Sequence, residues 1–92
     1  MKVIIYGSEI CGDCTDVLQR LKEISANDLQ YYFIDITENV TNMKRFLKLR
    51  DTSDLFLDVR EQHTIGIPFF QFDDGFCTLD VNAAYKKMGL KE

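Results

Sequence analysis

The chain has 92 residues, with 11 basic and 15 acidic side chains and a formal net charge of −4. This length allows one domain, residues 1–92, because two separate cores would each be too small to fold without disulfides or bound metals. Hydrophobic residues make up 46% of the chain, which excludes a disordered protein. The negative net charge argues against nucleic acid and anionic membranes, so we expect neither as a partner.

The N-terminal residues do not predict an export signal. The apolar run Val3–Tyr6 is shorter than the roughly 7–15 residues of a signal-peptide core, and no later run approaches the roughly 18 residues that cross a bilayer. We therefore expect a cytoplasmic protein. In that reducing compartment, paired cysteines are more often catalytic or metal-binding than structural.

The first part of the chain predicts a βαβ unit. Val3–Tyr6 is a continuous apolar run ended by Gly7, and Tyr31–Ile36 is a second such run, so we expect both as buried strands. Between them, apolar residues at helical spacing begin at Cys11, and Asn27-Asp28 is the expected end of that helix. Strands connected in this way should be parallel, with a right-handed crossover.

Two helices are expected next. Apolar residues at helical spacing run from Val40 to the neighbourhood of Arg50, after several residues that commonly start helices. A break over 51–53 separates this helix from a shorter one that carries Leu55, with Ser53 or Asp54 as its N-terminal cap.

The last part predicts a hairpin and a final helix. Phe69–Phe72 and Phe76–Leu79 flank Asp73-Asp74-Gly75, which is typical of an antiparallel hairpin. Asp80 is expected to cap a helix that ends at Gly89. The fold class is therefore α/β, in the order βαβ, helices, ββα.

The strongest functional signal is Cys11-Gly12-Asp13-Cys14, which lies between a strand end and a helix start. A thiol in the first helical turn faces unpaired N–H groups and the positive end of the helix dipole, which favour the thiolate. The negative charges of Glu9, Asp13 and Asp16 act in the opposite direction, because they disfavour a second anion. Because Cys14 lies one turn after Cys11, the pair can close a disulfide. We expect Cys11 to attack a target disulfide and Cys14 to resolve the mixed disulfide.

Other interpretations of these cysteines stay open. They could be inert core residues, or half of a metal or iron–sulfur site for which His63 and Cys77 are the other soft ligands. Neither of those residues belongs to a second closely spaced pair, so we expect no structural metal. Cys77 itself is expected to be a small core residue. A non-catalytic, partner-binding domain is a further alternative.

A strand leading into Cys-x-x-Cys at a helix start, followed later by Ile67-Pro68 before a hairpin, resembles the thioredoxin fold and, within it, the glutaredoxins. The segments Phe46–Asp51, Ile65–Pro68 and Asp74-Gly75 are similar to the glutaredoxin-related proteins. The resemblance covers nearly the whole chain. It implies a thioredoxin-like fold, with a four-stranded mixed sheet flanked by helices, and a thiol-disulfide oxidoreductase.

The resemblance also implies roles for single residues. Cys11 maps to the nucleophile and Cys14 to the resolving thiol. Ile67-Pro68 would be a cis peptide beside them, with the main-chain N–H and C=O of Ile67 binding the substrate backbone. Gly12, Asp13 and Asp80 are further candidate substrate contacts, although Asp80 is better explained as a helix cap.

Two positions differ from the family pattern where glutathione would bind. Ser8 replaces a lysine that pairs with a glutathione carboxylate, and Leu79-Asp80 replaces a Gly-Gly pair that lets the backbone approach glutathione. We therefore expect a protein or low-molecular-weight disulfide as the substrate and no bound organic cofactor. Glutathione is one candidate reductant, and the protein is expected to be a monomer.

Overall fold

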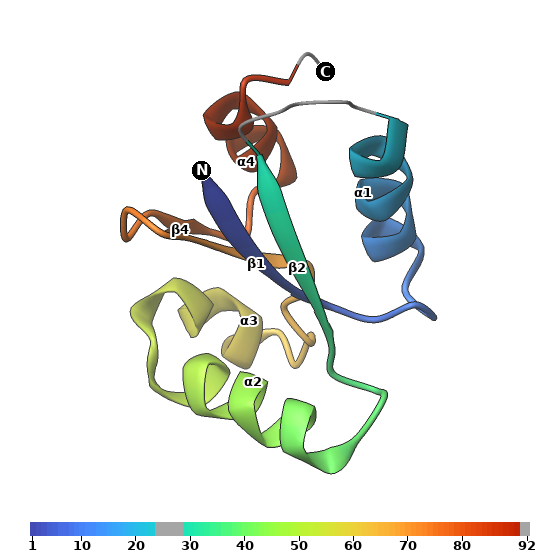
Figure 1. Ribbon diagram of the computed structural model, residues 1–92. Helices are drawn as coiled ribbons and strands as arrows, with labels where there is room; N and C mark the ends of the chain where they lie inside the picture. The colour runs from blue at the N-terminus through green and yellow to red at the C-terminus, as the bar shows by residue number, and fades with distance from the viewer. Residues whose placement is uncertain (24–28, 91–92) are drawn as a thin grey trace.

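The computed structural model describes residues 1–23 and 29–90 (Figure 1). These ranges form β1 (Lys2–Gly7), α1 (Gly12–Glu23), β2 (Gln30–Asp35), α2 (Val40–Thr52), the 3-10 helix η1 (Asp54–Phe56), α3 (Leu57–Glu61), β3 (Phe69–Phe72), β4 (Cys77–Thr78) and α4 (Val81–Met88). The predicted α/β class and order of elements are confirmed. The expected end of the first helix, Asn27-Asp28, lies outside the described residues. No described helix has the length and apolar character needed to cross a membrane.

The four strands form one mixed sheet in the order β2-β1-β3-β4. β1 runs parallel to β2, with Ile4 opposite Tyr32, and antiparallel to β3, with Ile5 opposite Phe70. β3 and β4 form the predicted antiparallel hairpin. The expectation that Tyr31–Ile36 is a buried strand is wrong for its N-terminal part, where Tyr32 is 53% exposed. The cause is position, because β2 is an edge strand with no neighbour on one side.

Helices cover both faces of the sheet (Figure 1). On one face, α1 and α4 pack against the sheet in a core made by Val3, Ile5, Val17, Leu21, Phe70, Phe72, Ala84, Tyr85 and Met88. On the other face, α2 and η1 pack over the ends of β1 and β3 in a core made by Tyr6, Ile36, Phe46, Phe56 and Phe69. The ring centroids of Phe56 and Phe69 are 4.8 Å apart in this aromatic cluster. The two cores follow from the alternation of side chains along each strand.

Short polar side chains define the helix ends. Asn39 caps α2, Ser53 caps η1, and the carboxylate of Asp80 accepts hydrogen bonds from two backbone N–H groups of α4. Gly89 ends α4 in the left-handed conformation, with φ of 78°, which glycine adopts without steric cost. The predicted caps at Ser53 and Asp80 and the predicted stop at Gly89 are confirmed.

Candidate functional site

Cys11 lies at the start of α1, directly after the loop that leaves β1. Its N–H donates to the carbonyl oxygen of Ser8 at 3.1 Å, which closes a tight turn. Its own carbonyl oxygen accepts the N–H of Thr15 at 3.0 Å, which is the first helical hydrogen bond of α1. The side chain is half-buried and the thiol is free. The loop therefore places an accessible sulfur at the N-terminal end of a helix.

Cys14 is fully buried, one turn further along α1, and its thiol is also free. Burial raises the pKa of Cys14 from its ordinary 9.0 to about 12, which a backbone hydrogen bond from Ser8 partly opposes. The value of about 12 also includes smaller increases from the hydrogen bond to Cys11 and from the charges of Cys11 and Asp13. Cys14 therefore keeps its proton at neutral pH, and it is buried, whereas Cys11 is accessible.

A chain of hydroxyl groups connects the Cys11 loop to the end of β2. The Oγ atom of Ser8, a residue that is only 1% exposed, lies 2.7 Å from Oγ1 of Thr37. The Thr37 hydroxyl donates to a carboxylate oxygen of Asp35 at 2.6 Å, so the Ser8 hydroxyl donates to Thr37. Ser8 Oγ then accepts the N–H of Ile10 at 3.3 Å. The Ser8 hydroxyl therefore connects the loop before Cys11 to Thr37 at the end of β2 and to the backbone of Ile10 within the loop.

The carboxylate of Asp35 anchors this chain. It also accepts the backbone N–H groups of Thr37 at 2.8 Å and of Glu9 at 3.3 Å. Hydrogen bonds from Thr37, above all from its hydroxyl, lower the pKa of Asp35 below its ordinary 3.8. Asp35 is therefore ionised at neutral pH. Sequence reasoning missed this residue and the role of Thr37, although a carboxylate and a hydroxyl at the end of a strand parallel to β1 were a usable signal.

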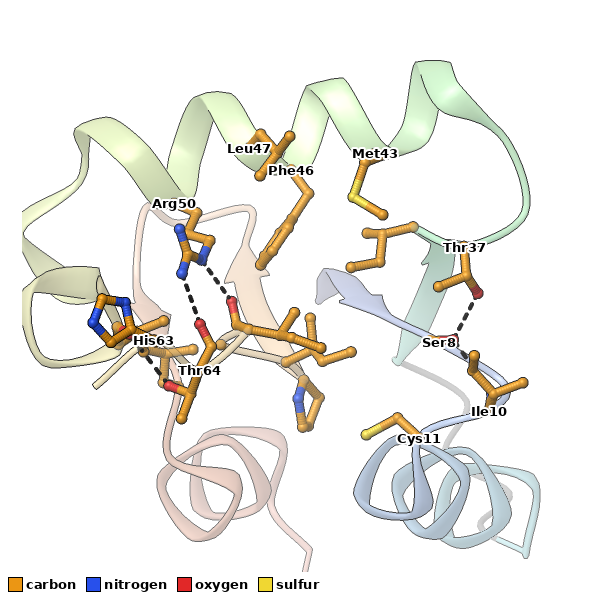
Figure 2. A pocket seen from close by; sticks show the side chains of 17 residues that line it. Ser8, Ile10, Cys11, Thr37, Met43, Phe46, Leu47, Arg50, His63 and Thr64 are labelled. Carbon is orange, nitrogen blue, oxygen red and sulfur yellow. Dashed lines mark hydrogen bonds between the residues drawn. The ribbon is translucent and has the colours of Figure 1, made fainter. Parts of the chain in front are cut away.

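A groove of about 920 Å³ opens beside Cys11. Figure 2 shows the Cys11 side chain at one end of it, with Met43, Phe46, Leu47 and Arg50 along the wall formed by α2. The groove is lined mainly by apolar side chains and by the loop before β3; its lining residues are Ser8, Ile10, Cys11, Ile36, Thr37, Met43, Phe46, Leu47, Arg50, Val59, His63, Thr64, Ile65, Gly66, Ile67, Pro68 and Leu79.

Arg50 fixes the loop that forms the opposite wall (Figure 2). Its Nε atom donates to the carbonyl oxygen of Ile65 at 3.1 Å, and Nη2 donates to that of Thr64 at 2.8 Å. Gly66, with φ of 91°, packs where a Cβ atom would lie 2.9 Å from the ring of Phe56. The sequence did not indicate this role for Arg50, because its partners are main-chain atoms of a distant loop.

The Ile67–Pro68 peptide bond is cis, as the resemblance implies. Both residues line the groove that Cys11 enters. Within the described residues, the main-chain N–H and C=O of Ile67 have no hydrogen-bond partner. The groove therefore has an unpaired stretch of backbone in its wall, available to a bound chain.

The other predicted site residues lie elsewhere. Gly12 and Asp13 are exposed in the first turn of α1, and Asp80 caps α4; none of these three lines the groove. His63 lies at the end of the groove opposite Cys11 (Figure 2). Cys77 is half-buried on β4, against the second core. Residues 1–23 and 29–90 contain no group of three or more His, Cys, Asp or Glu side chains that could hold a metal.

Comparison with known proteins leaves the function to be argued from this site. No protein-family model matches the chain, and no solved structure matches it. An uncharacterized protein of Haemophilus influenzae is 27% identical over 81 residues, which cover 88% of this chain and 91% of that protein. The similarity therefore extends over nearly the full length of both chains.

Proposed function

We propose that the protein is a small thiol-disulfide oxidoreductase of thioredoxin-like, glutaredoxin-related fold, with Cys11 as the nucleophile and Cys14 as the resolving thiol. The observation that carries the proposal is the difference between the two cysteines. Cys11 is accessible in a groove at a helix N-terminus, whereas Cys14 is buried behind it and holds its proton. A dithiol that attacks and then resolves a mixed disulfide needs one accessible sulfur to attack the substrate and a second, protected sulfur to resolve the intermediate.

The arrangement of the strands supports the proposed fold. The order β2-β1-β3-β4, with β2 parallel to β1 and the β3–β4 hairpin antiparallel, is the sheet that the resemblance implies. Helices lie on both faces, and the cysteine motif follows the central strand β1. Ile67-Pro68 precedes β3, the other central strand, so this segment and the motif meet at the same end of the sheet.

The chemistry follows from these positions. The Cys11 thiolate attacks one sulfur of the substrate disulfide, a bond forms between the two sulfurs, and the substrate S–S bond breaks. The first substrate thiolate leaves and takes a proton from solvent. Cys14 then loses its proton and attacks the Cys11 sulfur, which releases the second substrate thiol. The substrate gains two electrons, and the protein is left with a Cys11–Cys14 disulfide.

A thiol reductant must then return two electrons to the protein. Glutathione or another thiol system is a candidate for this step, and the reaction uses no bound organic cofactor. The free N–H and C=O of Ile67 support the binding of an extended substrate backbone beside Cys11.

Substitution of each cysteine tests the proposal. Cys11→Ser should lower the reduction of hydroxyethyl disulfide by dithiothreitol to the uncatalysed rate, because the attacking sulfur is lost. Cys14→Ser should accumulate a mixed disulfide at Cys11, visible by mass spectrometry. Cys77→Ser is the matched control and should turn over like the wild type, because Cys77 lies outside the groove. Wild-type turnover by Cys11→Ser would refute the assignment.

A further inference from the structure

Within the described ranges of the chain, the part of the groove next to Cys11 offers no unpaired basic side chain to a ligand, because His63 lies at the opposite end. Among its described lining residues, Arg50 and His63 are the only basic side chains, and no carboxylate is present. Arg50 already donates from Nε and Nη2 to two carbonyl oxygens, and its Nη1 atom contacts the carboxylate of Asp51 at 3.3 Å. A ligand carboxylate would therefore have to compete with bonds that hold the wall of the groove.

The surface around Cys11 is acidic. Glu9 and Asp13, two positions before and two positions after the cysteine in the sequence, are both exposed. Glu9 also borders a second hollow together with Asp35 and Glu38, and hydrogen bonding keeps Asp35 ionised. Like charges at close range repel, so a substrate with carboxylates near its disulfide is disfavoured here.

The same groove has exposed apolar side chains on its rim. Ile10 is 86% exposed, Ile65 is 58% exposed and Leu47 is 37% exposed. All of them line the groove that Cys11 enters, and Ile10 and Leu47 are labelled in Figure 2. Apolar side chains gathered around a reactive group favour a partner that covers them with apolar residues of its own.

We propose that the groove selects polypeptide disulfides in which the reacting cysteine has apolar neighbours and no adjacent carboxylate. The bound segment lies extended along Ile67 and covers Leu47 and Ile65. Glutathione, which carries carboxylates on both sides of its cysteine, is a poor substrate for the same reasons. This inference rests on the proposed thiol-disulfide chemistry and names the substrate class for it.

The test compares disulfides that differ only in the residues beside the cysteine. The reduced protein is mixed, in single turnover, with the symmetric disulfides of acetylated and amidated Leu-Cys-Val and Glu-Cys-Glu, with oxidised glutathione, and with hydroxyethyl disulfide. Rates are followed by acid quenching and mass spectrometry and divided by the rate of each disulfide with dithiothreitol. We expect the Leu-Cys-Val disulfide to exceed the acidic peptide and glutathione by about tenfold or more, since one apolar side chain buried is worth at least that factor.

Two variants with matched controls locate the selectivity in the groove. Ile65→Ser should lower the rate with the apolar peptide several-fold, whereas Leu57→Ser, at a residue 55% exposed outside the groove, should not. Leu47→Lys should raise the relative rate with oxidised glutathione, because it supplies the missing cation. Leu55→Lys, outside the groove, should leave that rate unchanged.

The outcomes separate the inference from the function beneath it. Equal normalised rates for all four disulfides, or equal effects of the groove variants and their controls, would overturn the substrate class and leave the oxidoreductase standing. Failure to reduce any disulfide, hydroxyethyl disulfide included, would overturn the proposed function and the inference with it.

Discussion

The sulfur of Cys14 packs directly against Gly7, the last residue of β1. A Cβ atom on Gly7 would lie 2.9 Å from the Cys14 sulfur and 2.8 Å from the ring of Phe33. Cβ atoms do not occupy such short distances without displacing their neighbours. Gly7 therefore leaves the space in which the proposed resolving cysteine is buried, and the strand end and the cysteine form one packed unit.

Gly7→Ala should accordingly destabilise the protein. The added methyl group must push aside Cys14 or Phe33, and overpacking of this kind costs about 1–3 kcal/mol. Gly12→Ala is the matched control, because nothing lies within 4 Å of its Cβ position. It should leave the free energy of unfolding unchanged or raise it by up to about 1 kcal/mol. Urea denaturation of the reduced proteins measures both changes, and equal stabilities would contradict the packing at Gly7.

Alkylation should distinguish the two cysteines of the motif. Since burial raises the pKa of Cys14 to about 12, its thiolate is scarce at all pH values well below that. Iodoacetamide under native conditions, below pH 9.0, should modify Cys11 much faster than Cys14. Peptide mapping by mass spectrometry reads out the site, and denatured protein, in which both thiols are exposed, is the control. Faster labelling of Cys14 would reverse the proposed roles.

The same pKa predicts how stability depends on alkaline pH. The folded protein holds the Cys14 proton more tightly than the unfolded chain, so the contribution is fully present below pH 9.0. It is lost as pH rises from there toward about 12. The wild type should lose more stability over this interval than Cys14→Ala, which lacks the titrating group. Parallel losses in the two proteins would show that Cys14 titrates normally.

Thr37→Val should weaken the support of the Cys11 loop. Valine matches threonine in shape but cannot accept from the buried Ser8 hydroxyl or donate to Asp35. A buried hydroxyl that loses the acceptor of its proton costs about 1–3 kcal/mol, so the free energy of unfolding should fall by about that amount. Thr37→Ser keeps the hydroxyl and should retain most of the stability.

The dependence of stability on acidic pH provides a second test of the hydrogen bond between Thr37 and Asp35. The pKa of Asp35 is lowered mainly by the Thr37 hydroxyl, so its contribution to stability is present above pH 3.8 and is lost as pH falls below that value. The difference in stability between the wild type and Thr37→Val should therefore be larger near neutral pH than in acid. A difference that does not change with pH would show that Asp35 is not part of the link.

Local signals in the sequence predicted most of the fold. Caps at Ser53 and Asp80 and the stop at Gly89 depend on residues within one turn of the helix end, which a sequence displays directly. The exposure of Tyr32 could not be predicted in this way. An aromatic run indicates a strand, but whether the strand lies at an edge depends on how the whole sheet is ordered.

The candidate site could likewise be predicted from the sequence only in part. The sequence displays Cys11 and Cys14 as a motif, and the positions of strand and helix indicate which sulfur is accessible. The partners of the supporting hydrogen bonds are distant in sequence: Ser8 and Thr37 are 29 positions apart, and Arg50 is 14 positions from Thr64. Polar residues at the end of the second strand were a signal for Asp35 and Thr37, but the pairing with Ser8 and the partners of Arg50 arise only when the chain folds.

Arg50→Lys should separate the support of the groove from the chemistry of Cys11. Lysine keeps the charge but cannot donate to the carbonyl oxygens of Thr64 and Ile65 at once, as the planar guanidinium does. We expect a loss of about 1–3 kcal/mol in the free energy of unfolding. Reduction of a polypeptide disulfide should slow several-fold, because the loop that carries Ile67 is less well held.

Hydroxyethyl disulfide supplies the internal reference for this variant. It is too small to span the groove, so its reduction by Arg50→Lys should stay near the wild-type rate. Arg45→Lys is the matched control on the same helix, because Arg45 lies over the ring of Tyr6 at 5.8 Å and its side chain does not line the groove. This control should leave the ratio of the two rates unchanged. If Arg50→Lys slowed both substrates equally, Arg50 would be acting on Cys11 or on overall stability, and its role in presenting Ile67 would be wrong.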